Sequence, residues 1–267
     1  MDKAIMFFID YSKKTAVGLF IIAIGVRFIF GIPMPFILLL GISATVTFLL
    51  VCDIPNFFMY LGLLYVNIKY RFKPPSKENY TCKVDYMLPF AGKWTIIEGG
   101  LEKKLSHTWE AISQRYAYDF IFQGDETNLH SYICYEKEVL AAADGVVVKV
   151  SDEHPDSPIT GDSVFCDAWD IGGNHIVIKH ADQEYSVSSH LAPNSISVKV
   201  GDRVRQGEVV AKCGNSGNSG EPHLHFQLQS GKSFFFSAGL PIEFKLEVEN
   251  AILAYRQQSC HSAPAQS

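Results

Sequence analysis

Residues 214–226, GNSGNSGEPHLHF, join a glycine- and serine-rich loop to the start of a β-strand. Alternate side chains of a strand point to the same face, so His223 and His225 point together while Leu224 points to the opposite face. Two imidazoles on one face bind a single metal ion, or one binds the metal while the other moves protons. An H-x-H pattern is common on protein surfaces, so its meaning depends on partners elsewhere in the chain.

The composition excludes some classes of protein. The chain has 267 residues, 28 acidic and 23 basic side chains and a formal net charge of −5, so it lacks the basic surface that binds nucleic acid. Its six cysteines include no C-x-x-C pair, which argues against a zinc ribbon or a thioredoxin motif. The spacing of the cysteines leaves their redox state open, and nothing in the sequence indicates an oligomeric state.

Two apolar segments, residues 15–32 and 36–52, predict a transmembrane helical hairpin. Each is close to the ~20 residues with which a helix spans a bilayer. Arg27 lies near the end of the first segment, where its long side chain can reach the interface. A cleaved signal peptide has a much shorter apolar region. Residues 1–70 are therefore assigned to a membrane anchor that contacts the lipid bilayer.

A third apolar segment, residues 56–68, is short and rich in aromatic residues. It predicts either an interfacial helix or a thin third span. Lysines at positions 13 and 14 and basic residues after position 68 favour two spans, which would place the following domain in the cytoplasm. The function implied below favours the extracytoplasmic side. The sequence thus predicts a multi-pass protein of the cell membrane and leaves the side of the soluble domain open.

After a proline-containing linker at residues 71–79, the pattern changes to short runs of period two, broken by glycine and polar clusters. Because no long helical pattern intervenes, residues 80–250 predict an all-β domain, an antiparallel sandwich or half-barrel. Residues 251–267 are assigned to a C-terminal tail. The predicted strands are residues 87–90, 94–97, 118–122, 145–150, 175–179, 185–188, 197–200, 209–212 and 224–228.

Five blocks of this domain resemble lysostaphin-type, LytM-like zinc metallopeptidases. The blocks occur in the order found in that family, and the resemblance covers most of residues 115–229. It implies the duplicated hybrid motif fold, a Zn²⁺ ion and hydrolysis of peptide bonds in peptidoglycan crosslinks. The blocks are residues 139–147, 175–180, 189–191, 201–207 and 214–226.

The resemblance also implies roles for four residues. Asp119 corresponds to the carboxylate ligand of zinc and His225 to an imidazole ligand. His223 corresponds to the general base, and His190 to a second active-site histidine that stabilises the developing oxyanion. The residues around Asp119 point to a cation as well, because a carboxylate among aromatic neighbours is costly to bury without a partner.

The sequence departs from the family at the remaining ligand. Four residues before Asp119 the family has a histidine, whereas this chain has Arg115, which stays protonated and cannot bind zinc. In one interpretation His107, 12 residues before Asp119, supplies the third ligand, and His130 and His154 are less well placed. In the other, Arg115 pairs with Asp119 and the domain is a degenerate scaffold or regulator of cell-wall enzymes. The retained site residues favour the first, a membrane-anchored zinc metalloendopeptidase.

Overall fold

The computed structural model describes residues 41, 54–92, 94–122, 129–160, 171–242, 244 and 253–255. The hairpin predicted at residues 15–32 and 36–52 therefore lies outside the described residues, apart from Gly41. The chain divides into two compact units, Met1–Gly62 and Leu63–Ser267, and every described strand belongs to the second unit. The site and its surroundings can be described within that unit alone.

The third apolar segment forms helix α3, Ile54–Lys69. At 1.5 Å per residue its 16 residues extend about 24 Å, which is less than the ~30 Å hydrocarbon core of a bilayer. Within the described part of the chain, no helix is long and apolar enough to cross a membrane. The choice between an interfacial helix and a thin third span for residues 56–68 stays a prediction.

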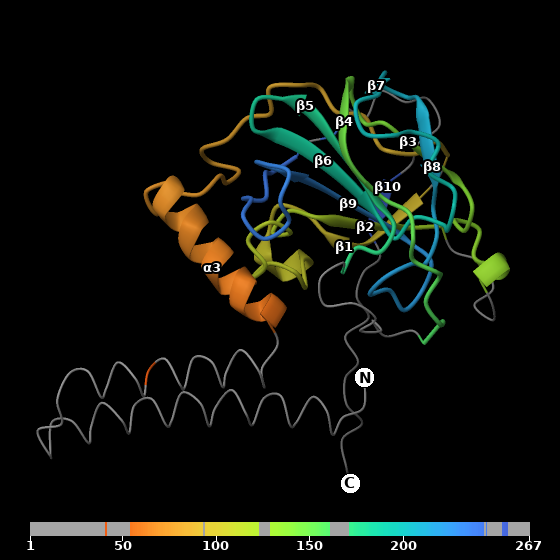
Figure 1. Cartoon of the computed structure of the whole chain (residues 1–267), viewed down its shortest axis with the longest axis horizontal. Helices are drawn as coiled ribbons and strands as arrows, with labels where there is room; N and C mark the ends of the chain where they lie inside the picture. Colours follow the sequence, from red (N-terminus) through yellow and green to blue (C-terminus); the bar gives the residue numbers. More distant parts are fainter. Residues whose placement is uncertain are drawn as a thin grey trace, which may run out of the picture. The chain divides into compact units, whose positions relative to one another are not determined.

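The second unit is built on two sheets, as Figure 1 shows. Antiparallel pairing dominates, and β10 alone among the described strands pairs in parallel, with β1. The larger sheet has the order β10 (Leu253–Tyr255), β1 (Trp94–Gly99), β2 (Tyr118–Ile121), β9 (Leu224–Gln229), β6 (Glu184–Ser189), β5 (His175–Ala181), β4 (Gly145–Ser151) and β7 (Arg203–Val204). The smaller sheet pairs β3 (Glu138–Leu140) with β8 (Val209–Lys212), and the short 3-10 helices are η1 (Lys103–Leu105) and η2 (Leu129–Ser131).

The prediction of a mainly antiparallel β domain is confirmed, with differences in individual strands. Residues 87–90 and 197–200 are not strands. Pro89 has no N–H to donate to a ladder, which interrupts pairing in the first of these segments. The pattern also missed β3, β7 and β10, which are two or three residues long and too short to show periodicity. β10 comes from the segment assigned to the tail.

The alternation of β9 separates the core from the site. Leu224, Phe226 and Leu228 are almost completely buried in the main apolar core, which also contains residues of the smaller sheet. Full burial of each such side chain contributes about 1.5–3 kcal/mol to folding. The alternating residues from His225 to Gln229 point to the opposite face of the larger sheet. The core thereby fixes the strand that carries the predicted site.

A buried carboxylate ties the segment before β1 to the larger sheet. Glu184, which is 0% exposed, accepts hydrogen bonds from the Tyr80 hydroxyl at 2.6 Å, the Lys83 amide at 2.6 Å and the Tyr86 hydroxyl at 2.9 Å. Burial and the neighbouring carboxylate raise the pKa of Tyr80 and of Tyr86, so both hydroxyls stay protonated as donors. Hydrogen bonds to a charged acceptor hold this segment against the sheet.

Replacement of Glu184 by glutamine should lower the free energy of unfolding by about 2 kcal/mol, because an amide cannot accept all three hydrogen bonds. We expect a fall in the melting temperature of about 4–8 °C, measured by circular dichroism on the full-length protein. Glu138→Gln is the matched control, since Glu138 is exposed on β3. Equal melting temperatures for the two variants would contradict this role for Glu184.

Candidate active site

Strand pairing brings together two predicted ligands from distant parts of the chain. β2 lies between β1 and β9, and its register places Asp119 directly opposite His225. Both side chains are buried, and the Nδ1 atom of His225 lies 2.7 Å from Asp119 Oδ1. The residues are 106 positions apart in the sequence, so this contact exists only because the ladder aligns the two strands.

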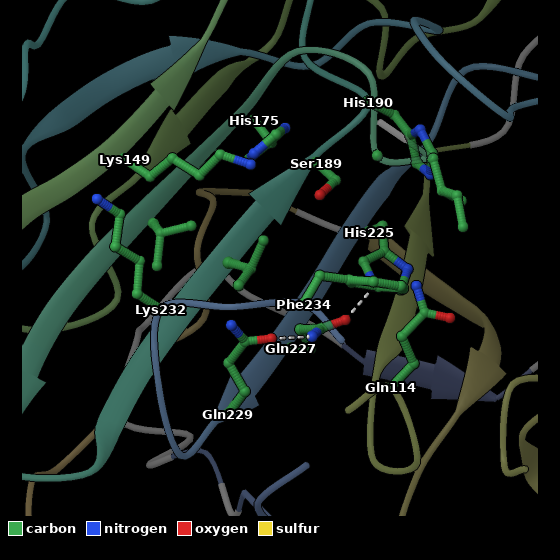
Figure 2. Close-up of a pocket in the computed structure, with 14 residues that line it drawn as sticks. Gln114, Lys149, His175, Ser189, His190, His225, Gln227, Gln229, Lys232 and Phe234 are labelled. Atoms are coloured by element: carbon green, nitrogen blue, oxygen red, sulfur yellow. Dashed lines mark hydrogen bonds between the residues drawn. The ribbon is translucent and has the colours of Figure 1, made fainter. Parts of the chain in front are cut away.

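The second ring nitrogen of His225 also has a partner. Its Nε2 donates to Gln227 Oε1 at 2.9 Å. The amide of Gln227 is oriented by its own donations from Nε2, to Gln229 Oε1 at 2.6 Å and to the Ser113 carbonyl at 3.2 Å (Figure 2). The proton on His225 Nε2 is therefore fixed, and Nδ1 is the nitrogen that faces Asp119.

Asp119 and His225 form a buried ion pair. Burial alone would raise the pKa of Asp119, but the charge and the hydrogen bond of His225 hold that pKa well below its usual range. Burial likewise opposes protonation of His225, and the neighbouring Asp119 carboxylate outweighs it and raises the pKa of His225. The pair thus carries one proton on Nδ1, at the position where a metal ion would bind in its place.

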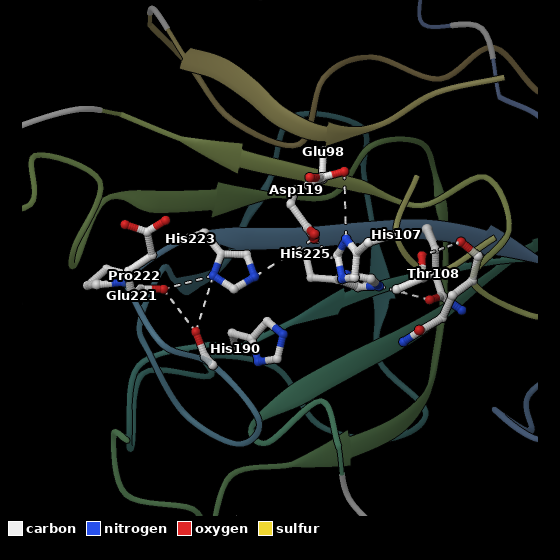
Figure 3. Close-up of polar contacts among 12 residues, drawn as sticks. Glu98, His107, Thr108, Asp119, His190, Glu221, Pro222, His223 and His225 are labelled. Atoms are coloured by element: carbon white, nitrogen blue, oxygen red, sulfur yellow. Dashed lines mark hydrogen bonds and ion pairs between the residues drawn. The ribbon is translucent and has the colours of Figure 1, made fainter. Parts of the chain in front are cut away.

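His223 directs its second ring nitrogen at the same carboxylate. Its Nδ1 lies 2.8 Å from the Glu221 carbonyl and 3.2 Å from the hydroxyl of Ser219. A carbonyl only accepts, so Nδ1 carries a proton, and in the neutral ring Nε2 carries the lone pair. Nε2 lies 3.8 Å from Asp119 Oδ1, and Figure 3 shows the two groups turned toward each other.

His190 is held in the same tautomer. Its Nδ1 donates to the Ser216 carbonyl at 2.8 Å, and its ring centre lies 4.6 Å from that of His223 and 5.9 Å from that of His225. Burial, reinforced by the charges of the two neighbouring histidines, holds the pKa of His190 well below its usual range. The ring is therefore neutral, with a lone pair on Nε2.

The backbone at His190 is strained. Its φ of 60° lies in the left-handed region, which non-glycine residues rarely adopt. The backbone N–H donates to the Gly172 carbonyl at 2.9 Å, and the carbonyl accepts from the Gly214 amide at 3.0 Å. Strain of this kind persists where the surrounding structure imposes it, as it often does at functional sites. These two loops therefore set the position of the ring.

Two glycines allow those loops to meet. A Cβ atom on Gly173 would lie 2.5 Å from the Gly217 amide nitrogen, and one on Gly217 would lie 2.3 Å from the Gly173 nitrogen. Both have positive φ, so any side chain would add strain to the clash. Ser216, between them, donates from Oγ to the Leu191 carbonyl at 2.7 Å. The glycine- and serine-rich loop before His223 thus supplies the carbonyl that accepts the hydrogen bond from His190.

Two other sequence-predicted residues lie apart from this cluster. The side chain of His107 is 57% exposed, and its Nδ1 lies 3.8 Å from Glu98 Oε2. It is near enough for its charge to contribute, as the weakest of the causes, to the lowered pKa of Asp119. His130, the less favoured candidate, packs edge-on against Tyr135 with ring centres 5.2 Å apart. Of the two, His107 is the one that influences the pKa of Asp119.

Arg115 does not pair with Asp119. Its guanidinium lies 5.5 Å from the ring centre of Trp109, and its Nε donates to the Trp109 carbonyl at 3.3 Å. The cation–π contact and the hydrogen bond satisfy the arginine within its own loop. The pairing of Arg115 with Asp119 that the degenerate interpretation predicted is therefore wrong, and the cation in contact with Asp119 is His225.

The donor set suits zinc but is incomplete. A carboxylate oxygen and three imidazoles converge, and each imidazole uses its outward N–H on a protein acceptor, as zinc-binding histidines do. Among the residues that the structure describes, no three His, Cys, Asp or Glu side chains form a group that could hold a metal ion. Asp119 and His225 are the two predicted ligands that lie in direct contact.

The sequence interpretation missed the residues that orient the histidines. Gln227 and Gln229 were detectable, because they alternate with the core residues of β9 and share a face with His225. The Glu221 and Ser216 carbonyls were not detectable, since a backbone acceptor carries no signature of residue type. They emerge only from the conformation of the loop at residues 214–222.

The comparison with family models identifies the class of protein. Residues 131–235 match the model of Peptidase family M23. This match confirms the resemblance to lysostaphin-type, LytM-like peptidases, and this part of the chain is an M23 peptidase domain. It contains His190, His223 and His225, whereas Asp119, His107 and Arg115 lie before it.

Two curated relatives match shorter segments. The cell division protein DipM of Caulobacter vibrioides is 39% identical over 57 residues, which are 21% of this chain and 9% of that protein. An uncharacterized metalloprotease of Haemophilus influenzae is 33% identical over 91 residues, 33% of this chain and 15% of that protein. The chain thus spans only a small part of the length of either relative.

Solved structures give more distant similarities. The catalytic domain of lysostaphin from Staphylococcus simulans is 22% identical, with 61% of this chain and 90% of that chain covered and a TM-score of 0.33. The catalytic domain of the prophage-encoded M23 protein EnpA from Enterococcus faecalis, solved as a point mutant, is 21% identical, with coverage of 58% and 94% and a TM-score of 0.38.

The ion pair predicts how His225 titrates in the metal-free protein. We expect a pKa above the ordinary ~6.5 in the wild type and below it in Asp119→Asn, where burial acts alone. The stabilisation that this pair contributes is complete below pH ~6.5 and is lost as the pH rises through the raised pKa. Side-chain NMR of chelator-treated protein measures both values. An unchanged pKa in Asp119→Asn, with Asp152→Asn as control, would show that the carboxylate does not hold the proton.

Proposed function

We propose that this protein is a zinc metalloendopeptidase that hydrolyses peptide bonds in peptidoglycan crosslinks. The proposal is carried by the convergence of His190, His223 and His225 on Asp119 beside an M23 domain. Asp119 and His225 would hold the zinc ion, with His107 as the third ligand. When bound, zinc polarises the scissile carbonyl and lowers the pKa of the attacking water.

His223 is assigned the role of general base. Its Nε2 carries the lone pair that takes a proton from the attacking water, because Nδ1–H already donates to the Glu221 carbonyl. The imidazolium that forms has a partner at each nitrogen, Glu221 on one side and Asp119 Oδ1, 3.8 Å from Nε2, on the other. A base in this arrangement typically contributes about 10²–10⁴ in rate.

His190 is assigned the role of orienting the attacking water. Its Nδ1–H is used by the Ser216 carbonyl, and its lowered pKa keeps Nε2 unprotonated. A nitrogen with a lone pair accepts a hydrogen bond from water and does not donate one to an oxyanion. We therefore assign it to the water in place of the oxyanion that the family resemblance implies.

His107 completes the ligand set in this proposal. Its imidazole is held only by a 3.8 Å approach to Glu98, and its side chain is 57% exposed, so turning toward Asp119 breaks few contacts. Arg115 packs on Trp109 and does not pair with Asp119. Asp119 and His225 would hold a zinc ion in place of their shared proton, with His107 as the third ligand.

A second candidate function is a non-hydrolytic scaffold or regulator of cell-wall enzymes. The direct 2.7 Å contact between Asp119 and His225 favours it, because this pair satisfies both groups without a metal ion. The two functions differ in zinc content and in peptide cleavage.

We also propose that the protein is anchored in the cell membrane, with its domain on the extracytoplasmic side. Two apolar segments of membrane-spanning length precede α3 in the sequence. In the second unit, Leu64, Ile68 and Phe72 are 52%, 61% and 73% exposed. Lys69 and Arg71 alternate with these apolar residues, a composition typical of a helix end in the membrane interface.

The enzyme proposal predicts about one zinc ion per chain in full-length protein, measured by mass spectrometry of the metal. His107→Ala should weaken zinc binding at least about tenfold, whereas the exposed His130→Ala should not. Purified crosslinked peptidoglycan should release new amino termini, and His223→Ala should reduce that rate about 10²–10⁴-fold. Wild-type protein that holds no zinc and leaves the crosslinks intact would favour the scaffold.

Arg115→His provides a matched gain-of-function control, since it restores a histidine four residues before Asp119. If His107 is the third ligand, Arg115→His changes zinc affinity little in the wild type and restores it in His107→Ala. A large gain in the wild-type background would show that the native site lacks its third ligand.

The membrane proposal predicts that full-length protein sediments with membranes, resists extraction by high salt and is released by detergent. Alkaline phosphatase, which is active only outside the cytoplasm, should be active when fused after Gln257. An inactive fusion together with an active cytoplasmic reporter at the same position would place the domain inside. Recovery of the protein without detergent would contradict the anchor.

A further inference from the structure

A pocket open to solvent lies beside the histidines, on the face of the larger sheet opposite the core. The volume that the centre of a water molecule can occupy within it is about 60 Å³, so it is a shallow hollow. His190 and His225 line one end, and Lys149 and Lys232 line the other, as Figure 2 shows. The proposed catalytic roles use only the histidine end, so the lysine end has no assigned function.

A row of paired residues connects the two ends. Lys149 on β4 pairs with Val177 on β5, Val177 with Val187 on β6, and Val187 with Gln227 on β9. All four residues line the pocket. Because neighbouring strands lie ~4.8 Å apart, the Cα atoms of Lys149 and Gln227 are separated by about 14 Å. Val177 and Val187 form an apolar floor of the pocket between Lys149 and Gln227.

The lysine end carries uncompensated positive charge. Among the described residues, no Asp or Glu lines the pocket, and neither Lys149 nor Lys232 has an ion-pair partner. Lys149 is half-buried at the end of the apolar row, where water screens its charge less than at an open surface. An anion bound at this end of the pocket would find two ammonium donors, Lys149 and Lys232, among the lining residues.

We propose that Lys149 and Lys232 form a carboxylate subsite for the peptide substrate. The subsite rests on the proposed function, because that function supplies the peptide. The aliphatic part of the bound residue would lie over Val177 and Val187, and its carboxylate would accept hydrogen bonds from the lysines. An extended peptide advances about 3.4 Å per residue, so the carboxylate lies about four residues from the scissile bond. The substrate class is therefore an acidic peptide.

A binding experiment on chelator-treated full-length protein tests the subsite without cleavage. The probes are fluorescein-labelled peptides of alanine and glycine, with one glutamate at each position in turn, and matched peptides with glutamine there. Fluorescence anisotropy should show that the best glutamate peptide binds about fivefold to tenfold more tightly than its glutamine counterpart. The difference should shrink as the salt concentration rises, because the charges are partly exposed.

Substitutions of Lys149 and Lys232 test whether these lysines cause the preference for glutamate peptides. Lys149→Gln with Lys232→Gln should abolish it, and Lys149→Arg with Lys232→Arg should retain it. Lys199→Gln, an exposed lysine outside the pocket, is the control and should leave the preference unchanged. Equal binding of the glutamate and glutamine peptides to the wild type, or a preference that persists in the double glutamine variant, would overturn the subsite.

The two proposals fail in different measurements. A preference for glutamate in chelator-treated protein, without cleavage by zinc-loaded protein, overturns the enzyme and supports the subsite. Cleavage that proceeds equally well with glutamate and glutamine peptides, together with equal binding, supports the enzyme and overturns the subsite.

Discussion

The site depends on hydrogen bonds that hold the outward N–H of each histidine. The Glu221 carbonyl holds His223 and the Ser216 carbonyl holds His190, while Gln227 holds His225. Each bond fixes a tautomer, so the opposite nitrogens face one another around Asp119. Lone pairs and a buried carboxylate cannot lie together without a proton or a metal ion between them. In the metal-free protein, one proton on His225 Nδ1 separates that nitrogen from the Asp119 carboxylate.

The fold positions the oxygen atoms that accept hydrogen bonds from these histidines. β9 buries one set of alternate residues in the core and thereby presents His225 and Gln227 on the open face. The contact between Gly173 and Gly217 lets the loop at residues 214–220 approach the turn before β5. That approach places the Ser216 carbonyl under His190, whose left-handed backbone is held between the same loops. Packing, loop geometry and ring protonation are therefore linked.

The sequence predicted features that depend on neighbouring residues better than contacts between distant segments of the chain. Period-two alternation predicted most of the described strands and the shared direction of His223 and His225, because it depends on neighbouring residues. The resemblance to the family led to Asp119 and His190. The pairing of Asp119 with His225 depends on a ladder between segments 106 positions apart, and carbonyl acceptors have no sequence signature. Arg115 looked like a partner for Asp119 by spacing, but its local stacking on Trp109 is the contact that forms.

The most direct measurement is anomalous diffraction at the zinc absorption edge from crystals of the zinc-treated full-length protein. A cation-binding centre predicts a peak within the ~2.0–2.2 Å bonding distance of Asp119 Oδ1 and His225 Nδ1, with the hydrogen bonds to Glu221, Ser216 and Gln227 unchanged. A map with no peak between these atoms, and with Asp119 and His225 still in direct contact, would contradict a cation-binding role for this site.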